Sequence, residues 1–263
     1  MIFLLVLIGV LTGVTTVLFG FGGGFVTVPV IVWVVAANGG EDAGRVAVAT
    51  SAVVMVVNAA IATSAARRDV LVLLRGRGRL LALLAGGGAM GAVITLGLPP
   101  DVASWGFVVY LAATIVDVLV RPGFLRPSRA ALGSGPPIPD LLGAPIGAIA
   151  ALLGVGGSIM TVPLLRRSGL PMGVAATLAN PMTLAISIPA TLVFLTASGH
   201  ASSGGVLMIG VVDAGAAGLL LLGAVPAILM LRHWPPRIPD RLHAWAYLAL
   251  LLAAALAMVA RIA

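Results

Sequence analysis

Residues 18–30 read LFGFGGGFVTVPV, and residues 152–164 read LLGVGGSIMTVPL. Seven of these 13 positions are identical at a fixed offset of 134. Further along the chain, Ala49-Thr50 is matched by Ala176-Thr177. Apolar helices often resemble each other in composition by chance, but a repeated Gly-x-Gly-Gly followed by Thr-Val-Pro is hard to obtain by composition alone. The pattern therefore predicts an internal duplication of the chain.

The composition excludes a water-soluble globule. Hydrophobic residues make up 60% of the 263 residues and charged residues only 9%, with a mean hydropathy of +1.18, whereas soluble domains carry roughly 25% charged residues. The apolar runs are too long for the alternating strands, each about 10 residues, of a membrane β-barrel. We therefore expect an all-α polytopic membrane protein with about eight membrane segments. The runs fall at 2–36, 46–66, 80–98, 102–120, 141–165, 173–197, 205–231 and 242–260.

The charged residues indicate an orientation in a lipid bilayer and exclude several other partners. All 15 basic residues are Arg, and they are scattered through short loops, which is typical of a membrane protein and not of a nucleic-acid-binding one. The chain contains no Cys, and its three His have no metal-ligand spacing, so neither a metal nor a cofactor is expected. The apolar start of the chain lacks the basic region of a signal peptide and is interpreted as the first membrane segment.

A stretch rich in Arg, Pro, Gly and Ser at 121–140 divides the chain into a first membrane repeat at 1–120 and a second at 141–263, with a cytoplasmic linker between them. If all eight runs are single spans, nine Arg lie inside and six outside. If runs 2–36 and 141–165 instead enter and return as hairpins, thirteen lie inside and only Arg45 and Arg261 outside. The positive-inside rule favours this second topology. It predicts two inverted repeats, each a Gly-broken hairpin plus three transmembrane helices, as in many secondary transporters. The arm 2–19 is long enough to cross the membrane, so a pair of short spans stays an alternative to a hairpin.

The glycine clusters at 20–24 and 154–157 are the predicted hairpin tips, because glycine reaches positive φ at little cost. Non-helical backbone at membrane depth must lie in protein or beside a water-filled cavity. The helix that follows each tip begins with backbone N–H groups that have no helical partner, and two such N-termini in one cavity would bind an anion. The predicted substrate-binding residues are Gly22, Gly23, Gly24, Thr27, Thr50, Ser51, Gly156, Gly157, Ser158, Thr161, Thr177 and Asn180. The alternatives are hydroxyls bonded to their own helix and glycines that serve packing alone.

Other polar and special residues within the runs have separate interpretations. Pro29 and Pro163 are expected to fix helix kinks and not to contact substrate. Asp213 lies inside run 205–231 with no basic neighbour in sequence, so it is either a proton-coupling residue or a protonated carboxyl packed between helices. Asn58, in the middle of its run, is expected to make a hydrogen bond between helices, with the role of a ligand as the alternative.

These motifs resemble the TauE/SafE family of bacterial and archaeal permeases. The resemblance rests on the paired Gly-rich motifs ending in Pro, on Val48-Ala49-Thr50-Ser51 with a weaker counterpart at Ala176-Thr177-Leu178, and on Arg67-Arg68-Asp69-Val70. It covers nearly the whole chain and implies transport of a small sulfur-containing anion across the cytoplasmic membrane, often export. The chain departs from an exact repeat at Ser158, which replaces Gly24, and at Leu178, which replaces Ser51.

Three classes of function can be considered for a sequence of this kind. The first is a secondary transporter of sulfite or an organosulfonate, driven by protons or by the gradient of the anion itself. The second is an anion channel of the same fold. The third, an intramembrane enzyme, is opposed by the absence of His-Glu-x-x-His, of Gly-x-Gly-Asp and of an embedded Ser–His pair. We therefore expect a multi-pass protein of the cell membrane whose partners are a small anionic substrate and lipid; a homo-oligomer stays open.

Overall fold

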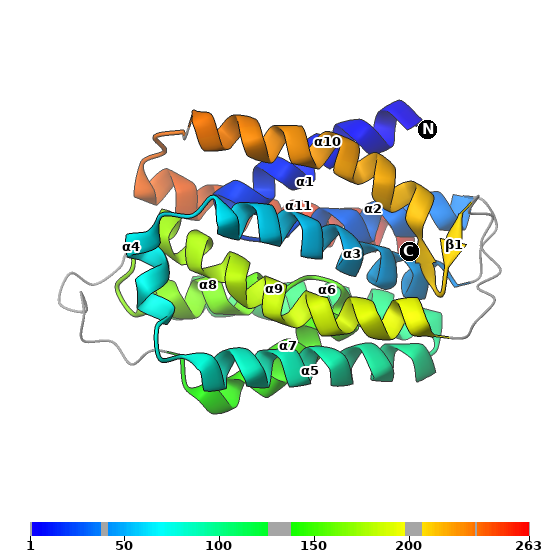
Figure 1. Cartoon of the computed structure of the whole chain (residues 1–263), viewed down its shortest axis with the longest axis horizontal. Coiled ribbons are helices and arrows are strands. Elements are labelled where there is room, and N and C mark those ends of the chain that lie inside the picture. Colours follow the sequence, from blue (N-terminus) through cyan, green and yellow to red (C-terminus); the bar gives the residue numbers. More distant parts are fainter. Residues whose placement is uncertain (1, 38–41, 126–137, 198–206, 235, 263) are drawn as a thin grey trace.

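The computed structural model describes residues 2–37, 42–125, 138–197, 207–234 and 236–262 (Figure 1). It confirms a helical membrane protein. The elements in chain order are α1 (Ile2–Phe19), α2 (Gly24–Ala37), α3 (Ala43–Ser64), α4 (Arg68–Leu71), η1 (Val72–Leu74), α5 (Gly78–Gly97), α6 (Pro100–Val120), η3 (Asp140–Leu142), α7 (Gly143–Leu153), α8 (Ser158–Arg167), α9 (Met172–Thr196), β1 (Met208–Ile209), β2 (Val212–Asp213), α10 (Ala214–His233) and α11 (Asp240–Ile262).

Seven helices in the described residues are long and apolar enough to cross a membrane, namely α1, α3, α5, α6, α9, α10 and α11. The remaining membrane segments are short. Helix α2 has 14 residues, α7 has 11 and α8 has 10. The two hairpins therefore differ, because the first has an arm of spanning length, 18 residues, and the second has two short arms.

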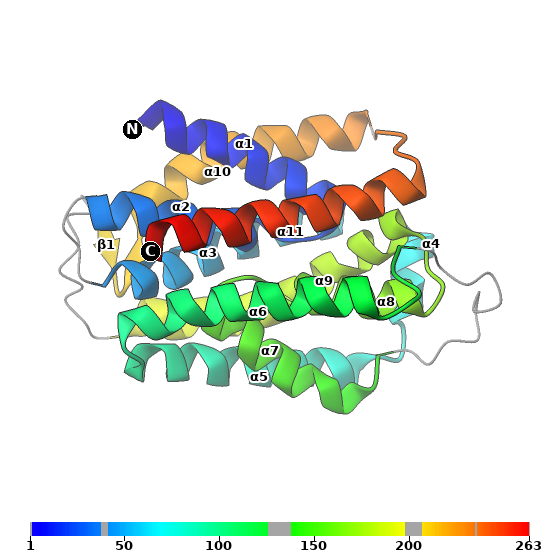
Figure 2. The ribbon, with the colours of Figure 1, turned by 180° about the vertical axis from the view of Figure 1, so that it is seen from behind.

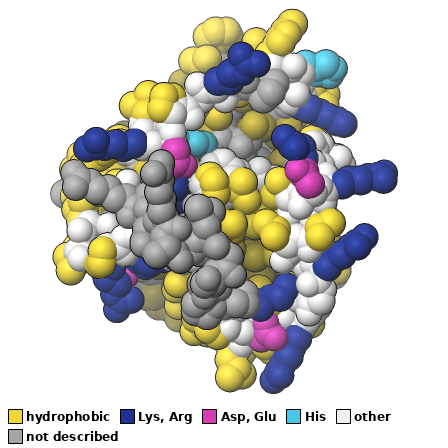
Figure 3. Space-filling model, turned by 90° about the vertical axis from the view of Figure 1, so that its left-hand side faces the viewer, with side chains coloured by type: hydrophobic (Ala, Val, Ile, Leu, Met, Phe, Trp, Pro, Cys, Tyr) yellow, Lys and Arg dark blue, Asp and Glu magenta, His cyan; other side chains and the backbone are white. Residues whose placement is uncertain are grey.

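Most arginines of the described chain lie at one end of the molecule. This Arg-rich end consists of residues 66–79, 121–125, 138–142, 166–171, 232–234 and 236–241, and it faces away from both chain termini (Figures 1 and 2). Seen from this side, Arg side chains are spread around the rim (Figure 3). Arg45 lies in the first turn of α3, a helix that begins at the opposite end (Figure 1). This distribution is consistent with the predicted inverted repeat, in which α1–α2 enters from one end and α7–α8 from the other.

The helices of the two halves pack reciprocally. Helix α1 packs along α10, and α7 packs along α5, which it crosses in Figure 2. In an inverted repeat these are the same pair, a hairpin arm against the second spanning helix of the other half. Glycines form both interfaces: a Cβ built on Gly13 would lie 2.5 Å from the carbonyl oxygen of Ala224, and Gly91 meets the backbone of Ala148 in the same way. Small residues let helix backbones approach closely in a membrane.

Run 205–231 contains one span, as predicted, but the span does not fill the run. Its start forms the antiparallel pair β1–β2, in which Ile209 faces Val212, and α10 begins only at Ala214. Gly210 makes the turn with φ +60° and lies against the carbonyl oxygens that end α9. Val211 and Val212 are buried, and β2 packs on α3. Hydropathy did not reveal this strand pair because its residues are as apolar as those of a membrane helix.

A buried arginine at the Arg-rich end fixes the second hairpin. Arg166, in the last turn of α8, is fully buried. Its Nε donates to the carbonyl oxygen of Phe124 at 2.9 Å, and its guanidinium forms an ion pair with Asp240 at the start of α11. The same carboxylate accepts the backbone N–H of Met172 at 2.7 Å. One ion pair thus joins the ends of α8, α9 and α11.

Candidate functional site

The two hairpin tips have matching backbone conformations at the duplicated glycines. Gly20 and Gly154 have φ +73° and +67°, and Gly22 and Gly156 have φ +65° and +67°. Only glycine adopts this left-handed region at low cost. The next pair differs, because Gly23 has φ +98° whereas Gly157 has φ −70° in the right-handed region.

The tips lie against each other between α3 and α9. A Cβ built on Gly156 would lie 3.2 Å from the carbonyl oxygen of Phe21 and 3.0 Å from the methyl group of Thr183. The same methyl group lies 2.8 Å from a Cβ built on Gly22, so Thr183 packs between both tips. The thioether of Met55 fills the other side. The predicted meeting of the tips is therefore present, but as a packed contact and not across an open space.

The helices that follow the tips begin in the same way. The carbonyl oxygen of Gly23 accepts the N–H groups of Val26 and Thr27, and that of Gly157 accepts those of Met160 and Thr161. The N–H groups before these positions have no partner within the helix. The N-termini of α2 and α8, each with a positive dipole end, therefore converge on the contact between the tips.

The three candidate hydroxyls of the first repeat take part in internal hydrogen bonds. The Thr27 hydroxyl donates to the carbonyl oxygen of Gly23 at 2.9 Å. The Ser51 hydroxyl donates to the carbonyl oxygen of Gly154 at 2.9 Å, which ties α3 to the tip of the second repeat. The Thr50 hydroxyl accepts the backbone N–H of Asp213 at 3.0 Å. These hydrogen bonds agree with the structural alternative for Thr27, Thr50 and Ser51, and a part in substrate binding stays a prediction.

The second repeat instead leaves buried polar groups without partners. The hydroxyls of Ser158, Thr161 and Thr183 and the Oδ1 of Asn180 make no hydrogen bond within the described chain. From the first repeat, Asn58 has neither amide atom bonded, and its Nδ2 lies 2.8 Å from a Cβ built on Gly23. All five side chains are at most 3% exposed. Since buried polar groups are almost always hydrogen-bonded, this cluster needs a ligand or water.

Two of these five residues were missed or misassigned from the sequence. Asn58 was expected to bond a neighbouring helix, and the structure gives it no such partner. Thr183 was not singled out, although it follows Asn180 by three residues and therefore lies on the same face of α9. That spacing was the available signal.

Thr177 and Asn180 lie apart from the first-repeat candidates, in a cavity of about 270 Å³ at the Arg-rich end. The cavity lies between the end of α3, α4, α9 and α10. Arg67 and Arg232 also line it. The Thr177 hydroxyl donates to the carbonyl oxygen of Gly173 within its own helix. The predicted site residues therefore divide into a group at the tips and a group in this cavity.

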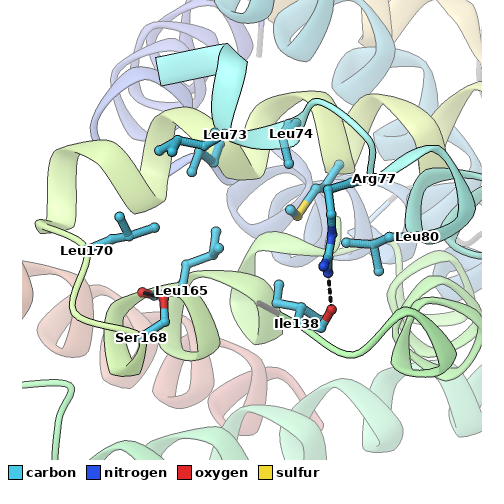
Figure 4. A pocket seen from close by; sticks show the side chains of 10 residues that line it. Leu73, Leu74, Arg77, Leu80, Ile138, Leu165, Ser168 and Leu170 are labelled. Carbon is cyan, nitrogen blue, oxygen red and sulfur yellow. Dashed lines mark hydrogen bonds between the residues drawn. The ribbon is translucent and has the colours of Figure 1, made fainter. Parts of the chain in front are cut away.

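A second cavity, of about 180 Å³, lies on the other face of α9 and is lined mainly by leucines (Figure 4). Arg77 also lines this cavity. Its guanidinium donates to the carbonyl oxygen of Ile138 and lies 3.3 Å from the Asp140 carboxylate. The charge of Arg77 is therefore used to hold the segment that begins the second repeat. Leu178, the counterpart of Ser51, also lines this cavity.

Both predicted kink prolines lie inside helices and are buried, Pro29 in α2 and Pro163 in α8. A proline deprives the carbonyl four residues earlier of its helical donor. For Pro163 that carbonyl belongs to Ile159, and the Tyr247 hydroxyl donates to it at 3.1 Å. Tyr247 thus satisfies the group that the proline frees and joins α11 to α8.

Asp213 is not inside a helix, contrary to the sequence interpretation, but precedes α10 as its N-cap. Its Oδ1 accepts the N–H of Ala216 at 2.9 Å, as capping carboxylates do. Its side chain is nearly buried, at 9% exposure. Among the residues that the structure describes, no group of three or more His, Cys, Asp or Glu has the arrangement of a metal site.

The comparisons with known proteins agree with this architecture. No curated protein and no solved structure matches the chain. The model of one protein family, described as sulfite exporter TauE/SafE, matches residues 5–258, which include both hairpins and all seven spanning helices. The protein is therefore an integral membrane protein of a transporter family, and it belongs to the sulfite exporter TauE/SafE family.

Proposed function

We propose that this protein is a secondary transporter that exports a small sulfur-containing anion, such as sulfite or an organosulfonate, across the cell membrane. The anion would bind where the N-termini of α2 and α8 converge. The observation that carries this proposal is the cluster of buried, unpartnered side chains at that point. It consists of Asn58, Ser158, Thr161 and Thr183.

The chemistry of the cluster suits an oxyanion. Sulfite and sulfonates carry three oxygens that accept hydrogen bonds, and the tips offer backbone N–H groups, three hydroxyls and an amide as donors. None of these groups carries a full charge. A site without a buried arginine holds the anion loosely enough to release it, as a transporter requires.

Binding in this position requires the tips to separate. In the structure the methyl group of Thr183 and the side chain of Met55 occupy the space between Gly22 and Gly156. An anion that enters would replace these contacts with hydrogen bonds. A site that opens only when the tips separate favours a carrier that moves between states over an anion channel with a continuous pore.

Proton coupling through Asp213 is the second part of the proposal. Its carboxylate accepts the N–H of Ala216, so protonation would weaken this cap at the start of α10. Asp213→Asn keeps the capping geometry and removes the titration. If Asp213 carries the proton, this variant transports without dependence on a pH gradient; unchanged coupling would leave Asp213 with capping alone.

The experiment is sulfite flux into proteoliposomes, with and without a pH gradient, together with counterflow. Saturable flux with counterflow is expected for a carrier, whereas leak-like flux without counterflow would establish the channel. Ser158→Ala combined with Thr161→Val should raise KM at least tenfold, because each lost hydrogen bond to a charged ligand is worth about 1.5–3 kcal/mol. Thr196→Val is the control, since its hydroxyl bonds the Leu192 carbonyl within its own helix, at the end of α9 that lies beyond Thr183. Equal KM values in the double variant and the control would contradict binding of the anion at the tips.

A further inference from the structure

The cavity at the Arg-rich end is positively charged at its edges and apolar on most of its wall. Arg67, before α4, and Arg232, near the end of α10, contribute guanidinium groups, and the lining contains no acidic residue. Arg232 is exposed and has no ion-pair partner in the described chain. Arg67 is paired with Asp69 through two hydrogen bonds of 3.1 and 2.7 Å. The charge available to an incoming anion therefore belongs mainly to Arg232.

A polar stripe on α9 connects this cavity with the hairpin tips. Thr177, Asn180 and Thr183 follow each other at intervals of three residues, so each is a neighbour of the next on the surface of the helix. Thr177 is partly exposed in the cavity, Asn180 is 3% exposed and also lines it, and Thr183 is fully buried against Gly22 and Gly156. The unbonded Oδ1 of Asn180 lies halfway along this stripe.

The corresponding position in the first repeat is closed. Thr50 is the sequence counterpart of Thr177, yet it is fully buried and bonded to the backbone of Asp213. The strand pair β1–β2 covers it, with Val211 and Val212 packed beneath. Of the two equivalent threonines, only the one at the Arg-rich end faces a cavity.

We propose that this cavity is the entrance through which the anion reaches the tips from the Arg-rich end, with Arg232 drawing it in and the α9 stripe leading it inward. The inference rests on the proposed transport function and adds the direction of access and the residues that control it. Arg67 attracts the anion less than Arg232 does, because its guanidinium is paired with Asp69. The hydrogen bond from Arg67 lowers the pKa of Asp69, and at neutral pH the negative charge of Asp69 offsets the positive charge of Arg67.

The test compares sulfite transport in inside-out and right-side-out membrane vesicles, at low salt so that the charges are not screened. Inside-out vesicles present the Arg-rich end to the medium. Arg232→Gln should raise the KM of uptake about threefold in inside-out vesicles and leave it unchanged in right-side-out vesicles, as expected for one exposed charge within several ångströms of the anion. Arg75→Gln removes an exposed charge from the same end but outside the cavity, and it should change neither value.

Asp69→Asn gives an opposite expectation that a general loss of folding cannot imitate. It releases Arg67, so KM in inside-out vesicles should fall by a similar factor. An unchanged KM for both Arg232→Gln and Asp69→Asn, with saturable wild-type flux, would overturn the entrance and leave the transport function standing. Absence of saturable sulfite flux in the wild type would instead overturn the proposed substrate.

Discussion

The contact between Thr183 and the first hairpin tip can be tested by a pair of compensating substitutions. In Gly22→Ala the added Cβ would lie 2.8 Å from the methyl group of Thr183, while its next neighbours, in Met55, begin at 3.3 Å. The substitution therefore has two costs. The left-handed backbone at φ +65° contributes about 1–2 kcal/mol for a residue with a Cβ, and overpacking contributes about 1–3 kcal/mol.

Thr183→Ser removes the clashing methyl group and keeps the hydroxyl that the proposed site uses. The double variant should therefore recover the overpacking cost and retain the backbone strain. A double-mutant cycle on the free energy of unfolding in detergent should give a favourable coupling of about 1–3 kcal/mol. Gly86→Ala is the control, because nothing lies within 4 Å of its added Cβ and its backbone is helical. A coupling below about 0.5 kcal/mol would mean that Thr183 does not pack on this tip.

Three further outcomes are expected. Tyr247→Phe leaves the carbonyl freed by the kink proline without a donor, and should lower the free energy of unfolding by about 1–3 kcal/mol, measured by denaturation in detergent. Asp240→Asn weakens the ion pair of the buried Arg166, and should cost about 1–3 kcal/mol in the same assay, less than a fully buried pair because the aspartate is 43% exposed; a neutral result would contradict a clamping role. In this chain without Cys, Ser168→Cys should react with an impermeant thiol reagent only from the cytoplasmic side and Gly97→Cys only from outside; the reverse pattern would contradict the proposed orientation.

The features that the sequence predicted correctly depend on local chemistry. Positive φ at Gly22 and Gly156 follows from the position of glycine in an apolar run, where a reversal of the chain needs that conformation. The family follows from motifs and the membrane segments from run length, although about eight segments were expected and seven helices of the described chain are of spanning length. None of these conclusions requires knowledge of which helices are neighbours.

The features that the sequence missed depend on distant neighbours. Whether Ser51 is free or bonded is decided by the carbonyl of Gly154, which is 103 residues away along the chain. Asn58 and Thr183 are important because packing leaves them without partners, and a single side chain in an apolar run does not indicate this. Asp213 was placed inside a helix because the valines and isoleucine around it are equally apolar in a strand pair.

The second repeat has Leu178 where the first has Ser51, and Ser158 where the first has Gly24. These two differences explain why the tips are held differently. Ser51 in the first repeat bonds the tip of the second, but its counterpart Leu178 has no hydroxyl and cannot fix the first tip in return. That tip is held instead by apolar contacts, with the ring of Phe21 5.1 Å from that of Tyr247. Hydrogen bonds are directional and aromatic contacts tolerate sliding, so the first tip should move more readily when an anion enters. Ser158, where the first repeat has Gly24, adds its free hydroxyl to the tip that stays fixed. An anion would therefore meet one rigid, hydroxyl-rich half-site and one mobile, glycine-rich half-site, which is the asymmetry needed to bind and then release it.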